Sequence, residues 1–279
     1  MDRSPSKTAL LVCAYRARAS RWDKPLFVDP WAEALAGDDG AEIASELDRR
    51  GASMERWFAV RTTYLDRLVG QAIDRLPASQ IVILGAGYDT RAARLARPGV
   101  RFFEVDHPAT QTAKRERLAR LPGYPDAATY VSCDFEREDP IDRLTASGFE
   151  RAQPTFVIWE GVVMYLTETS IRRTLSRLAT GLDPRSALAF DFVGGKLGTG
   201  LGLSPADEQR RSYVGELGEP LVFGTDDIVP LLHNCGFPWA RSVCFEDLAP
   251  ELLGGATIER HRLQHIAVAA LVAEAALQT

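Results

Sequence analysis

Between residues 81 and 192, short runs of β-branched and aromatic residues alternate with longer stretches of helical character. The runs cover residues 81–84, 101–105, 129–131, 155–159 and 187–192, and the helical stretches lie at 91–97, 107–120 and 168–182. Strands that alternate with helices form βαβ units, whose strands pair in parallel and whose crossovers are right-handed. This alternation predicts a doubly wound α/β fold with a mainly parallel sheet.

The segments on either side of this region complete the predicted fold. Residues 1–78 have helical character, and apolar residues recur at helical spacing from 54 to 76, interrupted by Arg61. Residues 193–224 are rich in glycine and are expected to form a flexible lid. A helix is expected at 226–234. Two strands are expected after it, at 240–245 and 264–271, with a turn between them at residues 254–255. These two strands are expected to form an antiparallel pair at the C-terminal edge of the sheet.

These segments predict a single domain. Its expected parts are an N-terminal helical cap (1–78), a ligand-binding core (79–192), a lid over a substrate (193–224) and a segment that completes the sheet (225–279). A chain of 279 residues is long enough for one large α/β domain with a sizeable core.

Composition excludes several other classes of protein. The formal charge is −5 and the arginines are scattered, whereas a nucleic-acid-binding protein carries a basic patch. The four cysteines lack C-x-x-C spacing, so neither a disulfide framework nor a metal site is expected. The N-terminus lacks the apolar core of a signal peptide, and no apolar run is long enough to span a membrane. We expect a cytoplasmic protein with no nucleic-acid or membrane partner; its oligomeric state stays open.

Glycines or acidic residues follow four of the five predicted strands. A Gly-Ala-Gly turn at 85–87 follows the first strand, and Asp106, Asp134 and Glu160 follow the next three. Ligands of open α/β sheets bind outside the carboxyl ends of the strands, where glycines admit a ligand and an acid about 20 residues further on binds ribose hydroxyls. An acid at a strand end also caps helices, which is the alternative role for each of the three. Together the four features predict a ligand that contains adenosine.

The predicted ligand is S-adenosylmethionine rather than a dinucleotide. Thr90 occupies the third glycine position of the G-x-G-x-x-G fingerprint, which allows close helix packing beside a pyrophosphate. S-adenosylmethionine has no pyrophosphate, and its sulfonium and ammonium groups favour an acidic pocket. Arg61 needs an anionic partner, because an unpaired buried charge is costly. That partner is either the methionine carboxylate of the cofactor or an acid of the chain.

Four motifs carry a resemblance to a known family. They are Arg-Thr-Thr-Tyr-Leu-Asp at 61–66, Leu-Gly-Ala-Gly-Tyr-Asp-Thr-Arg at 84–91, Glu-Val-Asp-His-Pro at 104–108 and Glu-Gly-Val-Val-Met-Tyr-Leu at 160–166. The series resembles the leucine carboxyl methyltransferase family and, more closely, is similar to its bacterial branch of S-adenosylmethionine-dependent O-methyltransferases. The resemblance covers roughly residues 7–192. It implies a Rossmann-like class I methyltransferase fold and S-adenosyl-L-methionine as the cofactor.

The resemblance also implies roles for single residues. The cofactor would be bound by Arg61, Gly85, Gly87, Asp106, Asp134, Phe135 and Glu160. Arg61 would bind the methionine carboxylate, Asp106 would bind the ribose hydroxyls, and Glu160 would lie near the amino group. The side chain of Asp134 and the backbone of Phe135 would read the adenine. Phe135 stands where the family commonly has leucine, a change that a backbone contact tolerates.

The reaction implied by the resemblance is methyl transfer to an oxygen, in the first place that of a carboxylate. Tyr165 would lie near the transfer site, so Tyr165 and Arg61 are the catalytic candidates. A carboxylate, with a pKa near ~4, is ionised at neutral pH and needs no base. A phenol or alcohol would need one, and the four histidines are better explained as packing or surface residues. Arg210, Arg211 and Tyr213 are expected either to hold the acceptor or to lie on a solvated helix face.

The expected acceptor is a small molecule, such as a polyketide or another secondary metabolite, and this expectation rests on the resemblance. Two alternatives stay open, namely methyl esterification of a protein or peptide C-terminal carboxylate and a non-catalytic methyltransferase-like binding protein. An NAD-dependent oxidoreductase is the main enzymatic rival, but the third glycine and a catalytic Tyr/Lys or His set are not recognisable.

Overall fold

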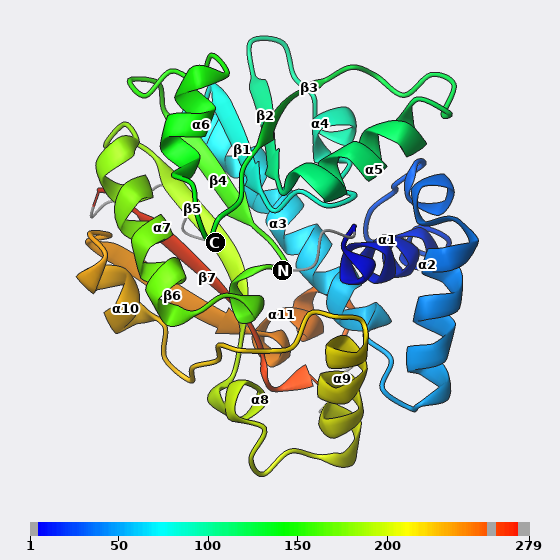
Figure 1. Cartoon of the computed structure of the whole chain (residues 1–279). Helices are drawn as coiled ribbons and strands as arrows, with labels where there is room; N and C mark the ends of the chain where they lie inside the picture. The colour runs from blue at the N-terminus through cyan, green and yellow to red at the C-terminus, as the bar shows by residue number, and fades with distance from the viewer. Residues whose placement is uncertain (1–4, 256–260, 273–279) are drawn as a thin grey trace.

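A central sheet organises the molecule, as the computed structural model shows for residues 5–255 and 261–272 (Figure 1). The strands are β1 (Gln80–Leu84), β2 (Arg101–Asp106), β3 (Ala128–Ser132), β4 (Thr155–Trp159), β5 (Ala187–Val193), β6 (Trp239–Cys244) and β7 (Gln264–Ala270). They lie in the order β3-β2-β1-β4-β5-β7-β6. Because β1 pairs in parallel with both β2 and β4, the strand order reverses between β1 and β4. A ligand crevice is expected at the carboxyl ends of these two strands.

The C-terminal strands complete the sheet in an antiparallel sense. β7 is antiparallel to β5 on one side and to β6 on the other. The prediction of a mainly parallel sheet with an antiparallel addition from the C-terminal segment is therefore confirmed. The structure adds that β7 is paired along both of its sides, so that β6 forms the edge.

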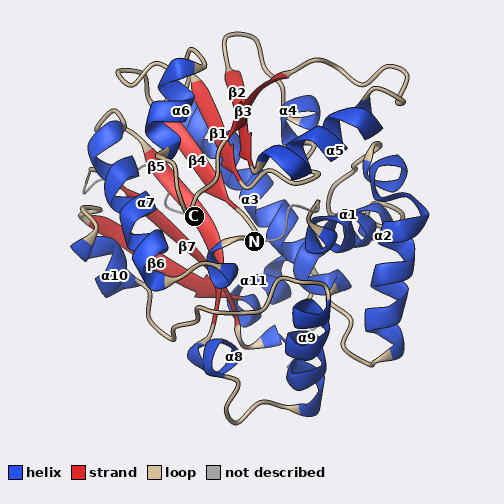
Figure 2. Cartoon of the chain, viewed as in Figure 1, coloured by secondary structure: helices blue, strands red, loops and turns tan. Residues whose placement is uncertain are grey.

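Helices cover both faces of the sheet (Figure 2). They are α1 (Lys7–Ala19), α2 (Ala32–Arg49), α3 (Glu55–Arg75), α4 (Arg91–Arg94), α5 (Pro108–Leu118), α6 (Pro140–Ala146), the 3-10 helix η1 (Val163–Tyr165), α7 (Glu168–Gly181), α8 (Gly195–Thr199), α9 (Pro205–Glu216), α10 (Val229–Asn234) and α11 (Phe245–Leu252). One core contains residues of α1, α2, α3, α5 and α11, and a second contains residues of α6, α7 and α10. No helix of the described segments is long and apolar enough to cross a membrane.

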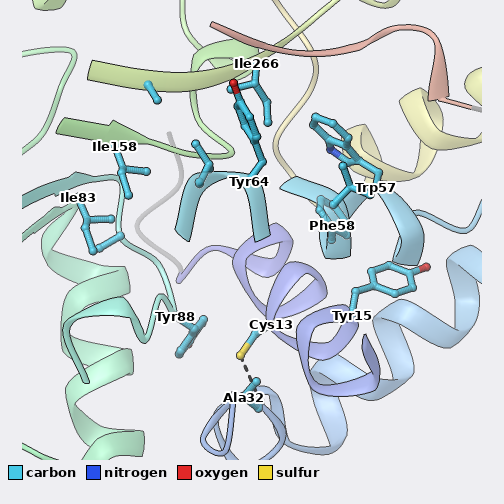
Figure 3. Packing of buried hydrophobic residues seen from close by; sticks show 14 of the residues in the cluster. Cys13, Tyr15, Ala32, Trp57, Phe58, Tyr64, Ile83, Tyr88, Ile158 and Ile266 are labelled. Carbon is cyan, nitrogen blue, oxygen red and sulfur yellow. Dashed lines mark hydrogen bonds between the residues drawn. The ribbon is translucent and has the colours of Figure 1, made fainter. Parts of the chain in front are cut away.

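Alternate residues of each central strand enter opposite cores. In β1, Ile81 and Ile83 belong to the first core, whereas Val82 and Leu84 belong to the second. Figure 3 shows Ile83 with side chains of α1 and α3, among them Trp57. Burial on both faces explains why β1, β4 and β5 are nearly continuous apolar runs rather than alternating patterns.

The last third of the chain contains more helix than the sequence predicted. The 193–224 segment, expected to be a flexible lid, holds α8 and α9. A Cβ atom on Gly198 would lie 2.6 Å from the backbone nitrogen of Gly224, so the helix α8 packs tightly on the returning chain. The glycine at 198 therefore serves close packing here. The predicted turn at 254–255 follows the helix α11, whose eight residues gave too short a periodic signal to be recognised.

Candidate active site

A cavity of about 430 Å³ lies where the strand order reverses, at the carboxyl ends of the central strands. The loops after β1, β2, β3 and β4 form part of its wall, and α1, α3, α9 and residues 218–221 are among the other segments that line it. All of the predicted cofactor-binding and catalytic residues line it, namely Arg61, Gly85, Gly87, Asp106, Asp134, Phe135, Glu160 and Tyr165. The fold thus brings together four motifs that are separated along the chain.

The glycine turn after β1 has a conformation that only glycine adopts easily. Gly85 and Gly87 have φ values of +64° and +48°. A Cβ atom on Gly85 would lie 2.3 Å from Cγ2 of Val162, and one on Gly87 would lie 2.9 Å from Cβ of Ala9. The turn is therefore pressed between α1 and the loop after β4, and its backbone forms part of the cavity wall.

Asp106, the acid at the end of β2, is tied to this turn. Its carboxylate accepts hydrogen bonds from the backbone N–H groups of Gly87 (2.5 Å) and His107 (2.6 Å). Burial raises the pKa of Asp106 to about 6, although these two N–H groups act in the opposite direction. Asp106 thus orders the turn and also presents a carboxyl group to the cavity.

Arg61 lies in the cavity wall between two acids. Its Nε lies 2.9 Å from Oε1 of Glu160, and its Nη1 donates to Oδ2 of Asp191 at 2.5 Å. The guanidinium also packs over the ring of Phe58, 4.7 Å from its centroid. The sequence left two kinds of partner open for Arg61, an acid of the chain or the cofactor carboxylate. The structure shows that acids of the chain pair with Arg61. Whether a cofactor carboxylate also contacts Arg61 stays a prediction.

Two residues of this charged group were not expected from the sequence. Arg91 contacts Glu160 and lies 2.5 Å from Asp89 and 2.6 Å from Asp66. Asp191, on β5, accepts from the backbone N–H of Gly161 as well as from Arg61. Arg91 lies in a motif that was recognised, but Asp191 lies within an otherwise apolar strand, and inspection of strand ends overlooks such a position.

These ion pairs set the protonation of the acids. Burial alone would raise the pKa of Glu160, but Arg91 and Arg61 outweigh it and lower that pKa. For Asp191, burial prevails over Arg61 and raises the pKa. Glu160 is thus held as a carboxylate, and Asp191 shares the same arginine.

The acid after β3 forms a local turn. Oδ1 of Asp134 accepts from the backbone N–H of Glu136 at 3.0 Å. The ring of Phe135 is buried, with its centroid 6.2 Å from that of Trp159. Asp134 does not cap the following helix, because Asp139 is the N-cap of α6, and both Asp134 and Phe135 line the cavity.

Two predicted substrate-binding residues do not line the cavity. Arg211 donates to the carbonyl oxygens of Gly198 (3.1 Å) and Leu221 (3.3 Å), and the hydroxyl of Tyr213 donates to that of Ile43 (3.0 Å). Arg210, the third residue of this predicted group, does line the cavity, as does Val214 of the same helix, α9. Arg211 lies on another face of α9 than Arg210, because a shift of one residue turns a side chain by about 100° around a helix. This placement argues against a direct substrate contact by Arg211 or Tyr213.

Thr8, Tyr165 and Glu219, from distant parts of the chain, lie together in the cavity wall. The hydroxyl of Thr8, in α1, donates to Oε2 of Glu219, and both residues line the cavity. Burial, followed by the negative charge of Glu219, raises the pKa of Tyr165, whereas Thr8 lowers it. Neither Thr8 nor Glu219 lies in a recognisable motif, so only the tertiary structure reveals this group.

The charged lining of the cavity is mostly acidic. Three arginines line it, Arg16, Arg61 and Arg210, and each has a carboxylate partner, in Asp29, Glu160 and Asp207 respectively. Seven acids line it, namely Asp89, Asp106, Asp134, Glu136, Glu160, Asp191 and Glu219. The excess of acids favours a ligand with positive charge. No group of His, Cys, Asp and Glu side chains among residues 5–255 and 261–272 could hold a metal ion.

The sheet order, the glycine turn and the acids at successive strand ends define a doubly wound α/β protein with a nucleoside-type cavity at its topological switch point. The family model described as "Leucine carboxyl methyltransferase" matches residues 9–179. The chain belongs to the leucine carboxyl methyltransferase family.

Similar proteins are consistent with this assignment. A protein of Mycobacterium tuberculosis named "Putative S-adenosyl-L-methionine-dependent methyltransferase" is 34% identical over 200 residues, which cover 67% of this chain and 57% of that protein. A second protein of that name, also from M. tuberculosis, is 36% identical over 192 residues, or 64% of this chain and 62% of the relative. The chain thus matches somewhat more than half the length of these relatives.

Solved structures with similar folds have low sequence identity. A DUF574 family protein from Streptomyces avermitilis has a TM-score of 0.62 at 14% identity, covering 92% of this chain and 96% of its own. A protein from Thermobifida fusca, described as a "putative methyltransferase", has a TM-score of 0.61 at 18% identity, covering 96% of this chain and 95% of its own. At this level of identity the similarity supports the fold alone.

Proposed function

We propose that this protein is an S-adenosyl-L-methionine-dependent O-methyltransferase that acts on a small molecule. The observation that carries the proposal is that all four family motifs converge on one acidic cavity at the switch point of the sheet. The cofactor has two positive groups and one carboxylate, so its net charge suits this lining. When bound, it would supply an activated methyl group on a sulfonium.

The side chains present fit such a cofactor. The turn at Gly85 and Gly87 offers bare backbone where a side chain would collide with Val162 or Ala9. We assign Asp106 to the ribose hydroxyls, and Asp134 with the backbone of Phe135 to the adenine. Glu160, kept ionised by its two arginines, suits the ammonium group.

Arg61 is assigned to the methionine carboxylate in addition to its two acids. A guanidinium has five N–H donors, and Arg61 uses only Nη1 in a hydrogen bond and places Nε close to Glu160. It can therefore contact a third carboxylate. Its ion pairs with Glu160 and Asp191 would hold the guanidinium in position before the cofactor binds.

The chain contributes orientation and exclusion of water to the reaction. Methyl transfer requires the acceptor oxygen, the methyl carbon and the sulfur in line, and such orientation lowers a barrier by roughly 7–11 kcal/mol. Tyr165 lies beside Thr8 and Glu219, where its hydroxyl is placed to orient an acceptor. We propose residues 193–224 as the cover of the acceptor site, because Leu197, Val214 and residues 218–221 line the cavity.

Methyl transfer can be tested with cofactor labelled on its methyl group and a panel of small hydroxyl and carboxyl compounds, among them polyketide-like aromatics. We expect label in an organic-extractable product that becomes volatile on mild alkaline hydrolysis only if the product is an ester. Label in a peptide or protein fraction alone would contradict a small-molecule acceptor. Cofactor binding without transfer to any member of the panel would favour the non-catalytic alternative.

A further inference from the structure

Several helices contribute apolar side chains to the cavity, and we assign this part of the lining to the acceptor. This apolar wall carries Leu47, Met54, Trp57, Met164, Leu197 and Val214, contributed by α2, the start of α3, η1, α8 and α9. Burial of apolar surface gives about 25 cal/mol per Å², so this wall favours a ligand with a largely apolar body. A peptide C-terminus, with its polar backbone groups, would find few partners there.

The cavity has no obvious counter-ion for an anionic acceptor. Arg210 lines the cavity from the same helix as Val214, and it lies 2.5 Å from Asp207 and donates to the carbonyl oxygen of Ala52 at 3.2 Å. Arg61 is paired with Glu160 and Asp191, and its remaining donors are assigned to the carboxylate of the cofactor. A carboxylate acceptor would therefore add negative charge to a lining in which acids outnumber arginines.

Glu219 offers a proton acceptor at this place. Among the described hydrogen bonds, its Oε2 accepts from Thr8, and Oε1 has no donor. The carboxylate lies close enough to Tyr165 to influence its ionisation, and both side chains line the cavity. A carboxylate fixed by one oxygen and open at the other is suited to accept a hydrogen bond from an entering hydroxyl group.

We infer that the methyl acceptor is a neutral, largely apolar phenol or alcohol and that Glu219 takes its proton. The inference rests on the proposed methyl transfer and differs from the carboxylate acceptor that the family resemblance implied. As the bond between the hydroxyl oxygen and the methyl carbon forms, the carbon–sulfur bond breaks and its electron pair leaves with the sulfur. The hydroxyl proton passes to the Glu219 carboxylate. Thr8 positions that carboxylate, and Tyr165 lies beside it.

The inference can be tested with two probes of similar shape, 4-nitrophenol and 4-nitrobenzoate, added to protein saturated with S-adenosylhomocysteine. We expect the wild-type complex to bind neutral 4-nitrophenol at least ~10-fold more tightly than 4-nitrobenzoate, the scale of one partly screened charge repulsion. The yellow phenolate band of bound 4-nitrophenol should appear at higher pH than that of the free compound, because Glu219 disfavours a second negative charge.

Glu219→Gln removes the charge and keeps the shape. In this variant we expect ~10-fold tighter binding of 4-nitrobenzoate and a phenolate band that appears at lower pH than in the wild-type complex. Glu216→Gln is the matched control, because Glu216 is exposed, pairs with Arg50 and does not line the cavity. It should behave as the wild type in both measurements.

Each other outcome contradicts the inference. Tighter binding of 4-nitrobenzoate by the wild type, no binding of 4-nitrophenol to the loaded protein, or an unchanged phenolate titration in Glu219→Gln would each overturn it. These results would leave the proposed cofactor in place, since the protein was first loaded with S-adenosylhomocysteine. Failure to load would instead overturn the proposed function itself.

Discussion

At the scale of single residues, Gly85 joins a backbone requirement to a steric one. Its φ of +64° is unfavourable for any side chain, and a Cβ atom there would lie 2.3 Å from Val162. Gly51 has a similar φ of +69° but nothing within 4 Å of a Cβ atom. We expect Gly51→Ala to lower the free energy of unfolding by ~1 kcal/mol, the cost of the backbone alone.

Gly85→Ala adds the collision to this cost. We expect it to lower the free energy of unfolding by a further ~1–3 kcal/mol, as overpacking does, and to weaken binding of S-adenosylhomocysteine. Chemical denaturation of both variants measures the difference. Equal losses in the two variants would show that the contact with Val162 does not constrain the turn.

Arg61 stabilises the folded site through its ion pairs with Glu160 and Asp191, whether or not a ligand is bound. Arg61→Ala leaves Glu160 and Asp191 without this partner, and loss of one member of a buried ion pair costs ~3–5 kcal/mol. Arg67→Ala is the control, because Arg67 lies on the same helix with its side chain 50% exposed and pairs with Glu251 on the surface. That change should cost ~0–1 kcal/mol.

The deficit of Arg61→Ala should depend on pH. Without the arginine the folded-state pKa values of both acids rise, so the folded variant binds protons that the unfolded chain releases. Stability of the variant should therefore recover, relative to the wild type, as the pH falls from 7 toward the raised pKa values. Thermal unfolding at several pH values measures this, and a deficit independent of pH would contradict the assigned ion pairs.

The raised pKa of Asp106 predicts a pH-dependent affinity. Its pKa of about 6 means that the group loses its charge as the pH falls through 6, and with it the stronger hydrogen bonds that a carboxylate accepts. We expect wild-type affinity for S-adenosylhomocysteine to be ~10-fold lower at pH 5 than at pH 8. Asp106→Asn should bind weakly with a flat profile over this range. A wild-type profile that is equally flat would remove Asp106 from the ribose site.

The raised pKa of Asp106 also makes the stability of the folded protein depend on pH. Between its ordinary pKa of 3.8 and about 6, the folded protein retains a proton on Asp106 that the unfolded chain releases. The wild type should thus lose stability relative to Asp106→Asn as the pH rises through this window.

At the scale of elements, two helical glycines of the 193–224 region have opposite environments. Gly198 in α8 faces the backbone of Gly224, whereas Gly215 in α9 has nothing within 4 Å of a Cβ atom. Gly215→Ala should raise the free energy of unfolding by ~0.5–1 kcal/mol through helix propensity. Gly198→Ala should lower it by ~1–3 kcal/mol, because the backbone must move. A gain in stability for both would mean that α8 does not pack as described.

The sequence predicted the elements that have long or fully buried apolar patterns. The segment 155–159 coincides with β4, and 54–76 differs from α3 by one residue at each end. The eight-residue helix α11 and the short α8 lacked enough turns for a periodic signal. Their positions depend on tertiary packing, such as the contact between Gly198 and Gly224.

Some residues of the candidate site were likewise predictable from the sequence, and others were not. Residues that follow a strand in sequence, such as Asp106 and Glu160, were predictable because the carboxyl ends of parallel strands meet at one edge. Thr8 and Glu219 were not, since only the folded chain brings α1 against residues 218–221. The sequence did not distinguish Arg210, which lines the cavity, from Arg211, which does not, because α9 has no clear apolar stripe to fix its orientation.

At the scale of the whole molecule, the fold separates two tasks. The loops after β1 to β4 provide acids and bare backbone for a nucleoside-type ligand, whereas α2, α3, α8 and α9 provide an apolar wall. The family model matches residues 9–179, which include the loops after β1 to β4 as well as α2 and α3, but not α8 and α9. The proposed acceptor wall thus combines helices from inside and outside the matched region.

We expect the acidic cavity to bind S-adenosylmethionine. Calorimetric titration of the purified protein with S-adenosylmethionine, S-adenosylhomocysteine and NAD tests it most directly. We predict binding of the first two with micromolar dissociation constants, about −8 kcal/mol, and no binding of NAD. Binding of NAD alone would contradict the account and would make Asp106 a ligand for a dinucleotide ribose.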